Sequence, residues 1–239
     1  LQAELGARVV CDSAVTHAHA RDTWSLAELL DYQGQPACSP IAVVEAESTA
    51  DVAAAMRICR AHKTPVVAYG GGSGVCGGIF VGEGTVVVST RGLSGLISLD
   101  NGDLTATFGA GTMGGDAERM VQEHGLTIGH WPQSIEVSTV GGWVATRASG
   151  QYSTGYGNIE DIILDLEVVL PDGEILRTRR TPRAAAGPDL RQLFLGSEGT
   201  LGIVTEVTVS LRPLAEHHVR QAFHFDGLAA ALAPVQQLM

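Results

Sequence analysis

Glycine is concentrated in one stretch where the main chain could bind a ligand. Ten of the 30 glycines fall within residues 70–95, and the run at 69–78 reads YGGGSGVCGG. Consecutive backbone N–H groups that glycine leaves accessible form an anion-binding nest. Residues 64–90 carry a single charged side chain, Glu83. The sequence therefore predicts a phosphate or pyrophosphate held by main-chain donors, with Ser73 as a helper; a plain glycine-rich hairpin is the alternative.

The common nucleotide and nucleophile motifs do not account for this loop. Gly72, Gly74 and Gly77 match GxGxxG, but the dinucleotide fingerprint also requires that the loop open a helix. The residues that follow, at 79–90, are β-prone, and no acid stands at the expected place on a second strand. No Lys-Ser/Thr pair follows the glycines, and GxSxG is absent, so neither a P-loop nor the usual nucleophile elbow is predicted.

Two further segments combine hydroxyl side chains with glycine. Residues 130–150 read HWPQSIEVSTVGGWVATRASG, with Arg147 as the only Lys or Arg. Their hydroxyls and glycines are Ser134, Ser138, Thr139, Gly141, Gly142, Thr146, Ser149 and Gly150. Residues 196–206 read GSEGTLGIVTE and again place small polar residues before a strand pattern. Such segments suit a ligand rich in hydroxyl, phosphate and ring acceptors.

Composition limits the partners and the compartment. The chain has 239 residues, 45% of them hydrophobic and 17% charged, which argues against disorder. A formal net charge of −11 disfavours nucleic acid and anionic membranes, and no apolar run is long enough to form a transmembrane segment. The four cysteines form no CxxC, and no signal peptide is evident, so we expect reduced thiols in a cytoplasmic protein. The polar stretch with His17, His19, Arg21 and Asp22 is interpreted as solvated, and no metal site is predicted.

The elements that would position these segments are a β-α-β unit followed by mixed strands. Residues 41–46 and 66–68 are typical of strands. Between them, Ser48 and Asp51 have capping-box spacing ahead of a helix whose apolar face contains Val52, Ala55, Met56 and Cys59. The later pattern predicts a helix at 114–124 with Gly125 as its C-cap, and strands at 85–90, 104–111, 162–170, 174–178 and 201–213. Strands and helices that do not strictly alternate favour an α+β domain.

Taken together in their order, the three segments resemble the vanillyl-alcohol-oxidase (PCMH-type) family of FAD-binding domains. The resemblance covers residues 36–213, and STVGGWVATRASG, YGNIED and PRAAAGPD before GSEGTLGIVTE are similar to its alkyldihydroxyacetonephosphate synthase subgroup. It implies a small parallel β-α-β subdomain at 36–100 packed on a larger, mainly antiparallel subdomain at 101–213. Residues 1–35 are then an N-terminal segment, and 214–239 begin a truncated substrate or cap domain.

The resemblance also implies which residues contact FAD. The loop Gly70, Gly71, Gly72, Ser73 and Gly74 would hold the pyrophosphate, and Ser134, Ser138 and Thr139 would bond phosphate or ribitol oxygens. Gly141, Gly142, Ser149 and Gly150 would let the isoalloxazine approach the main chain, and Glu198, Gly199 and Ile203 would lie near the adenine half. Further cofactor-binding candidates are Tyr69, Val75, Gln133, Thr146, Arg147 and Val204. Ser138 or Thr139 could instead cap a helix.

Three chemical roles are left as expectations. In the subgroup, a histidine at the place of His130 faces the flavin region, as a general base or a ligand of substrate phosphate; a core histidine is the alternative. Arg147 could stabilise phosphate or pair with Glu160 or Asp161. FAD is expected to bind noncovalently, because the loop holds no histidine and no cysteine occurs after residue 76.

The implied activity is an acyl-for-alkyl exchange on a dihydroxyacetone phosphate ester through an adduct at flavin N5. One alternative is an FAD-linked oxidase or dehydrogenase of a 2-hydroxy acid or alcohol, and another is a flavin-binding module without catalysis. The partner would be a small-molecule or lipid-like substrate, with homo-oligomers as a further possibility. Because the family's substrate domain follows the position of Pro213, residues 1–239 alone are expected to bind FAD without turning over ester substrates.

Overall fold

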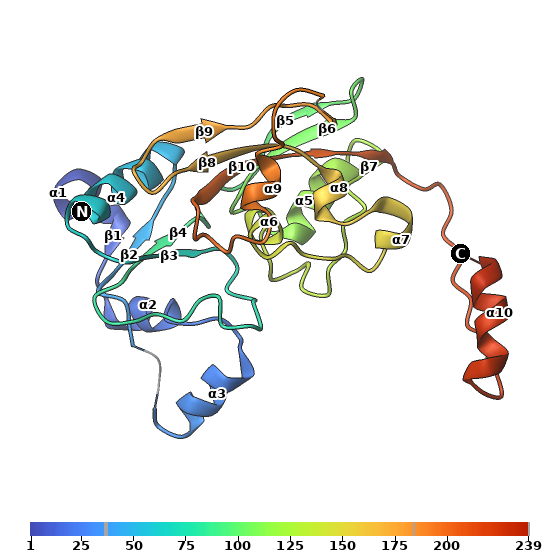
Figure 1. Cartoon of the computed structure of the whole chain (residues 1–239), viewed down its shortest axis with the longest axis horizontal. Helices are drawn as coiled ribbons and strands as arrows, with labels where there is room; N and C mark the ends of the chain where they lie inside the picture. The colour runs from blue at the N-terminus through green and yellow to red at the C-terminus, as the bar shows by residue number, and fades with distance from the viewer. Residues whose placement is uncertain (36–37, 184, 239) are drawn as a thin grey trace.

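A computed structural model describes residues 1–35, 38–183 and 185–238, and it contains two main sheets (Figure 1). In the first sheet three strands run parallel, and β1 pairs antiparallel with β2 at one edge. In spatial order its strands are β1 (Val9–Val10), β2 (Ala42–Glu45), β4 (Val86–Ser89) and β3 (Val66–Tyr69). The expected domain start at Pro36 and Ala184 of the PRAAAGPD motif lie outside the described residues.

The helix α4 (Thr49–Ala61) connects β2 to β3, and β4 pairs between these two strands. The predicted capping box is present: the Ser48 hydroxyl accepts a hydrogen bond from Asp51 N (3.2 Å), and the Asp51 carboxylate accepts one from Ser48 N (3.0 Å). The predicted apolar face of α4 is buried against the sheet. This crossover brings the carboxyl ends of β3 and β4 to one edge, where the glycine loop begins.

The second sheet is antiparallel throughout, in the order β5-β6-β10-β8-β9. Its strands are β5 (Leu96–Asp100), β6 (Thr105–Gly109), β10 (Ile203–Ser210), β8 (Ile163–Val169) and β9 (Ile175–Arg177). Helices α5 (Gly114–Gln122) and α6 (Val140–Thr146) cover one face, where Phe108, Trp143 and Val207 lie in a common core. The α+β architecture, with a parallel and a larger antiparallel part, is therefore confirmed.

The N-terminal residues are integrated into the first sheet. They form α1 (Gln2–Leu5), η1 (Gly6–Arg8), β1, α2 (Ser13–Ala18) and α3 (Ser25–Tyr32). The sequence did not reveal these elements, because a two-residue strand and helices of four to eight residues are too short to show a clear period. Strand β5 also lies within the range expected for the first subdomain, but it pairs with β6 in the second sheet.

The remaining elements are short or stand apart from the sheets. They are β7 (Leu126–Thr127) paired with β11 (Arg212–Pro213), α7 (Ser153–Tyr156), α8 (Ile159–Ile162), α9 (Arg191–Phe194) and α10 (Leu228–Leu238). Figure 1 shows α10 away from the rest of the chain, and it contains no buried residue. Across the described ranges, no helix has both the length and the apolar character needed to cross a membrane.

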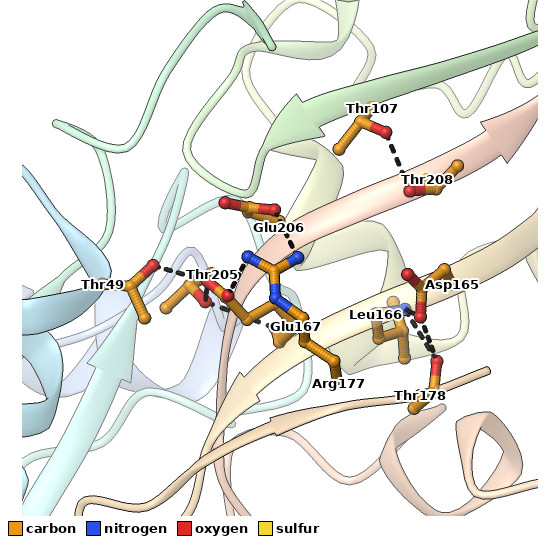
Figure 2. Close-up of polar contacts among 10 residues, drawn as sticks. All are labelled: Thr49, Thr107, Asp165, Leu166, Glu167, Arg177, Thr178, Thr205, Glu206 and Thr208. Atoms are coloured by element: carbon orange, nitrogen blue, oxygen red, sulfur yellow. Dashed lines mark hydrogen bonds and ion pairs between the residues drawn. The ribbon is translucent and has the colours of Figure 1, made fainter. Parts of the chain in front are cut away.

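A buried carboxylate joins the two parts of the fold (Figure 2). Glu167 on β8 is 5% exposed and accepts hydrogen bonds from the hydroxyls of Thr49 on α4 (2.6 Å) and Thr205 on β10 (2.9 Å). Its other oxygen pairs with the guanidinium of Arg177 on β9, which also pairs with Glu206 (3.0 Å). Through Glu167, the first turn of α4 is therefore joined to β8 and β10 of the second sheet.

Candidate functional site

The three motif segments meet around one cavity of about 330 Å³. The glycine loop leaves the carboxyl end of β3, the hydroxyl-rich segment leads into α6, and the third segment leads into β10. Crevices at the carboxyl ends of parallel strands are common ligand sites in α/β sheets. The cavity therefore lies where the sequence predicted contact between main chain and ligand.

The glycine loop packs directly on the second segment. A Cβ atom at Gly71 would lie 2.2 Å from the carbonyl oxygen of Val137, which is main chain and could not give way. Gly72 has φ of 69°, and a Cβ there would lie 2.2 Å from the Tyr69 hydroxyl. Side chains at these positions would separate the segments or strain the loop. Glycine is thus required here for close approach, and a glycine-rich hairpin alone does not explain it.

The third segment is held against α6 and β3. Gly196 N donates to Val144 O (3.0 Å), and Glu198 N donates to Ala145 O (2.9 Å), near the end of α6. A Cβ at Gly199 would lie 3.1 Å from the Cβ of Ala68 on β3. These contacts bring the third segment to the cavity beside the carboxyl end of β3, where the glycine loop starts.

Most of the predicted site residues line this cavity. They are Tyr69, Gly70, Gly71, Gly72, Ser73, Gly74, Val75, Ser134, Ser138, Thr139, Gly141, Gly142, Thr146, Glu198, Gly199, Ile203 and Val204. The predicted residues that do not line it are His130, Gln133, Arg147, Ser149 and Gly150. Residues up to 135 positions apart in sequence are thereby brought together, and their individual contacts with a cofactor stay predictions.

The hydroxyl groups of the second segment are partly committed to the protein. Thr139 is the N-cap of α6, and its oxygen accepts from Gly142 N (3.2 Å), so its hydrogen stays available to an acceptor. The Ser138 hydroxyl donates to Ser134 O (2.8 Å) and accepts from the indole nitrogen of Trp143 (2.8 Å). The capping alternative thus applies to Thr139, whereas Ser138 fixes the position of Trp143.

The cavity wall offers an anion neutral donors rather than cations. Among the described residues, no Lys, Arg or His lines it, and its carboxylates are Asp22 and Glu198. Burial raises the pKa of the Tyr69 phenol, so this group stays protonated at neutral pH. A pyrophosphate would depend on main-chain N–H groups of the loop, as the sequence predicted.

The polar residues outside the cavity have partners of their own. The Arg147 guanidinium pairs with Glu160 (3.4 Å), which is one of the two alternatives that the sequence left open. The Ser149 hydroxyl donates to the side-chain oxygen of Asn158 (2.7 Å). A Cβ at Gly150 would lie 2.8 Å from Trp131 N, so this glycine serves packing. Their contacts with a cofactor stay predictions.

His130 does not reach the cavity and lies behind Trp143. It is 1% exposed and packs edge-on against Trp143, with ring centroids 4.7 Å apart, and Trp143 lines the cavity. Within the described part of the chain neither ring nitrogen has a hydrogen-bond partner, and burial lowers the pKa of His130 to about 4. This geometry corresponds to the core-histidine alternative, because a general base must reach the proton that it accepts. Its catalytic role stays a prediction.

Sequence reasoning missed several residues of the wall, including Cys76, Ile79 and Thr90. The largest departure is Asp22, which was expected in a solvated segment but is 3% exposed and lines the cavity. One carboxylate oxygen accepts from nearby Trp24 N, but the contacts that bring Asp22 to the cavity are with Gly74 and Ile79, more than fifty positions away, and no local pattern signals them. Cys76 lies within the glycine-rich run at 69–78, and nothing in the sequence singles it out as a residue of the wall.

The chemistry of the wall suits FAD. The glycines that line the cavity present main chain without an intervening side chain, and neutral donors suit a buried pyrophosphate. The sequence profile of the family described as "FAD binding domain" matches residues 40–179, more than half of the chain.

Relatives of known name agree with this match. Alkyldihydroxyacetonephosphate synthase of Caenorhabditis elegans is 38% identical over 181 residues, 74% of this chain and 30% of that protein. Glycolate oxidase subunit GlcD of Bacillus subtilis is 35% identical over 201 residues, 84% of this chain and 43% of the relative. A solved structure of alkyldihydroxyacetonephosphate synthase has a TM-score of 0.83 at 30% identity and covers 89% of this chain and 39% of that one.

The chain thus spans less than half the length of these relatives. Its cofactor is FAD, as the family match shows and the chemistry of the cavity fits. With the fold, the cavity and the sequence match in accord, the chain belongs to the vanillyl-alcohol-oxidase (PCMH-type) family of FAD-binding proteins.

Proposed function

We propose that the chain is the flavin-binding part of an enzyme similar to alkyldihydroxyacetonephosphate synthase, which exchanges an acyl group for a long-chain alcohol on a dihydroxyacetone phosphate ester. The observation that carries the proposal is the meeting of the three motif segments around one cavity. The segment STVGGWVATRASG supplies α6 and much of this wall. Identity with the Caenorhabditis elegans synthase supports the same assignment.

In this proposal the chain's own groups bind and orient the cofactor. Main-chain N–H groups of residues 70–74 hold the pyrophosphate, and the free hydroxyl hydrogen of Thr139 donates to a cofactor oxygen. Gly141 and Gly142 in the first turn of α6 leave room for the isoalloxazine beside the main chain. Bound FAD supplies an electron-accepting ring system at this wall.

The substrate-binding groups are assigned to the part of the enzyme outside this chain. Catalysis requires groups within hydrogen-bond reach of the reacting atoms and with water excluded. The described wall contains two carboxylates, a phenol and a thiol as its titratable groups. We therefore propose that this chain contributes cofactor binding, and that His130 acts on catalysis through the position of Trp143 rather than by touching substrate.

An FAD-linked oxidase or dehydrogenase of a 2-hydroxy acid is the second candidate. The 35% identity with glycolate oxidase subunit GlcD over 201 residues favours it. The two candidates differ in electron balance. The exchange leaves the substrate at the same oxidation level, whereas an oxidase transfers two electrons from its hydroxy acid to the flavin.

Anaerobic titrations of the whole FAD-loaded enzyme, including the proposed substrate-binding part outside this chain, distinguish these candidates. We expect an acyl-dihydroxyacetone phosphate to change the visible flavin spectrum without formation of reduced acceptor, and lactate or glycolate to leave it unchanged. Flavin reduction by lactate or glycolate would favour the dehydrogenase and contradict the first proposal. No spectral response to any of the three would indicate a flavin-binding module, and failure to bind FAD at all would contradict the site itself.

A further inference from the structure

Residues 20–24, here called the clasp, pack against the glycine loop and the residues that follow it. They precede the range of the family match, which begins at residue 40. Three main-chain hydrogen bonds join the clasp to the loop: Asp22 N to Ile79 O (3.0 Å), Thr23 N to Gly74 O (2.9 Å) and Val81 N to Ala20 O (3.1 Å). The Thr23 hydroxyl also donates to Gly74 O (2.9 Å). The loop's conformation therefore depends on a segment that the family motifs do not include.

Asp22 is the one clasp residue that both contacts this loop and lines the cavity. One carboxylate oxygen accepts from Trp24 N (3.0 Å), and the other accepts a long hydrogen bond from Ile79 N (3.5 Å). A Cβ at Gly74 would lie 3.0 Å from the second oxygen, so the carboxylate packs against the loop backbone. The neighbouring Arg21 guanidinium bonds the Asp22 main-chain oxygen and pairs with Asp31.

The negative charge of Asp22 would repel an anionic ligand in the cavity that it lines. A pyrophosphate in this cavity would lie near a carboxylate that is 3% exposed, and no cation lines the described wall. Coulomb repulsion alone would make a neutral residue better here. A buried carboxylate is stabilised by the hydrogen bonds that it accepts. Asp22 accepts one from Trp24 N in the clasp and one from Ile79 N, just after the glycine loop.

We propose that Asp22 is a positioning residue of the FAD site, whose carboxylate holds residues 74–79 in the conformation that directs loop N–H groups toward the pyrophosphate. The proposal rests on the pyrophosphate position given under the proposed function. It extends the site to a segment that sequence reasoning assigned to solvent. It also predicts the sign of the change in FAD affinity when the charge is removed. Loss of positioning weakens binding, whereas loss of the charge repulsion alone strengthens it.

The test is Asp22→Asn, which keeps the size of the side chain and removes its charge. We expect FAD affinity, measured by the quenching of flavin fluorescence, to fall about tenfold, the equivalent of about 1.4 kcal/mol. In the FAD-free protein, amide hydrogen exchange should become faster in peptides that cover residues 74–81 and stay unchanged in β8 and β10. Binding of FAD as tight as in the wild type, or tighter, would overturn the proposal and indicate a purely electrostatic effect.

Asp12→Asn is the matched control. Asp12 also accepts two main-chain hydrogen bonds, from Ala14 N (2.9 Å) and Val15 N (3.2 Å), but it caps α2 and does not line the cavity. It should leave FAD affinity unchanged, and an equal loss in both variants would show a general effect of the N-terminal segment and refute a specific role for Asp22.

Thr23→Val keeps every charge and removes one clasp-to-loop hydrogen bond. It should weaken FAD binding two- to threefold, and it tests the same idea if Asp22→Asn does not fold. Unchanged affinity and unchanged exchange at 74–81 would contradict the proposal. A wild-type chain that binds no FAD would instead contradict the proposed function, while the exchange measurement in the FAD-free chain would still test the role of Asp22.

Discussion

Replacing His130 by leucine should make the stability of the FAD-free chain less dependent on pH. His130 is buried against Trp143 with both ring nitrogens unpaired, and burial lowers its pKa from an ordinary 6.5 to about 4. Because the unfolded chain binds this proton more readily than the native chain, the histidine destabilises the fold as the pH falls below 6.5. The loss grows until the pH reaches about 4 and is absent at alkaline pH.

The size of the effect follows from these two pKa values. For one group, the linkage relation gives a loss of about 2 kcal/mol at pH 5 and about 0.2 kcal/mol at pH 7. The free energy of unfolding of the wild type should therefore fall by about 2 kcal/mol more between pH 7 and pH 5 than that of His130→Leu. Leucine also removes two unpaired nitrogens from the core, which offsets part of any cost of changed packing.

Urea unfolding followed by circular dichroism at the two pH values measures this difference. The FAD-free protein is used because bound flavin adds a pH-dependent term of its own. His62→Gln, at the exposed C-cap of α4, controls for the loss of a histidine as such. If His130→Leu lost as much unfolding free energy between pH 7 and pH 5 as the wild type, the buried position of His130 would be contradicted. The histidine would then be hydrated in the native state and would face the cavity.

Three further predictions concern the cofactor and the joint between the sheets. Gly142→Ala should weaken FAD binding at least tenfold without lowering the urea midpoint. The midpoint should hold because a Cβ there meets only the Thr139 hydroxyl (3.1 Å) and alanine favours the helix. Gly155→Ala, in open space on α7, is the control that should keep full FAD affinity. Acid precipitation should release all the flavin into the supernatant, and colour retained on the pellet would show a covalent bond. Glu167→Gln should lower the free energy of unfolding by about 1–3 kcal/mol, since it weakens charged hydrogen bonds in a buried site. The control Glu174→Gln, at an exposed position, should change the free energy of unfolding by less than about 0.5 kcal/mol. Equal effects of the two substitutions would contradict the role of the Glu167 network.

Local rules in the sequence determined much of the fold around the cofactor. Ser48 and Asp51 are three residues apart, and a capping box needs only that spacing and a helix that follows. The strand patterns at 41–46, 85–90 and 201–213 coincide with β2, β4 and β10, because each is a run of β-branched or apolar residues between turn residues. The helix α5 was likewise predicted, although it ends at Gln122 and Gly125 adopts its positive φ of 72° beyond the end.

The glycine loop was predicted for a physical reason that needs no tertiary information. A cluster of glycines with almost no charge predicts main-chain contact with a ligand; in the structure the loop lines the cavity, and a Cβ at Gly71 would collide with the protein's own backbone. Which segment it would meet was not evident from the residues alone, since Val137 lies 66 positions further along the chain. The family resemblance supplied that arrangement, and the structure confirmed the fold.

Only the tertiary structure decided the contacts that join distant residues. Asp22 bonds a loop residue 57 positions away, and Glu167 bonds Thr49 across 118 positions. His130 is buried and Arg147 is paired with Glu160 because neighbouring elements pack around them, and neither burial nor pairing is written in the flanking sequence. A polar side chain's environment is set by long-range packing, whereas caps, turns and strand patterns depend on residues within a few positions of each other.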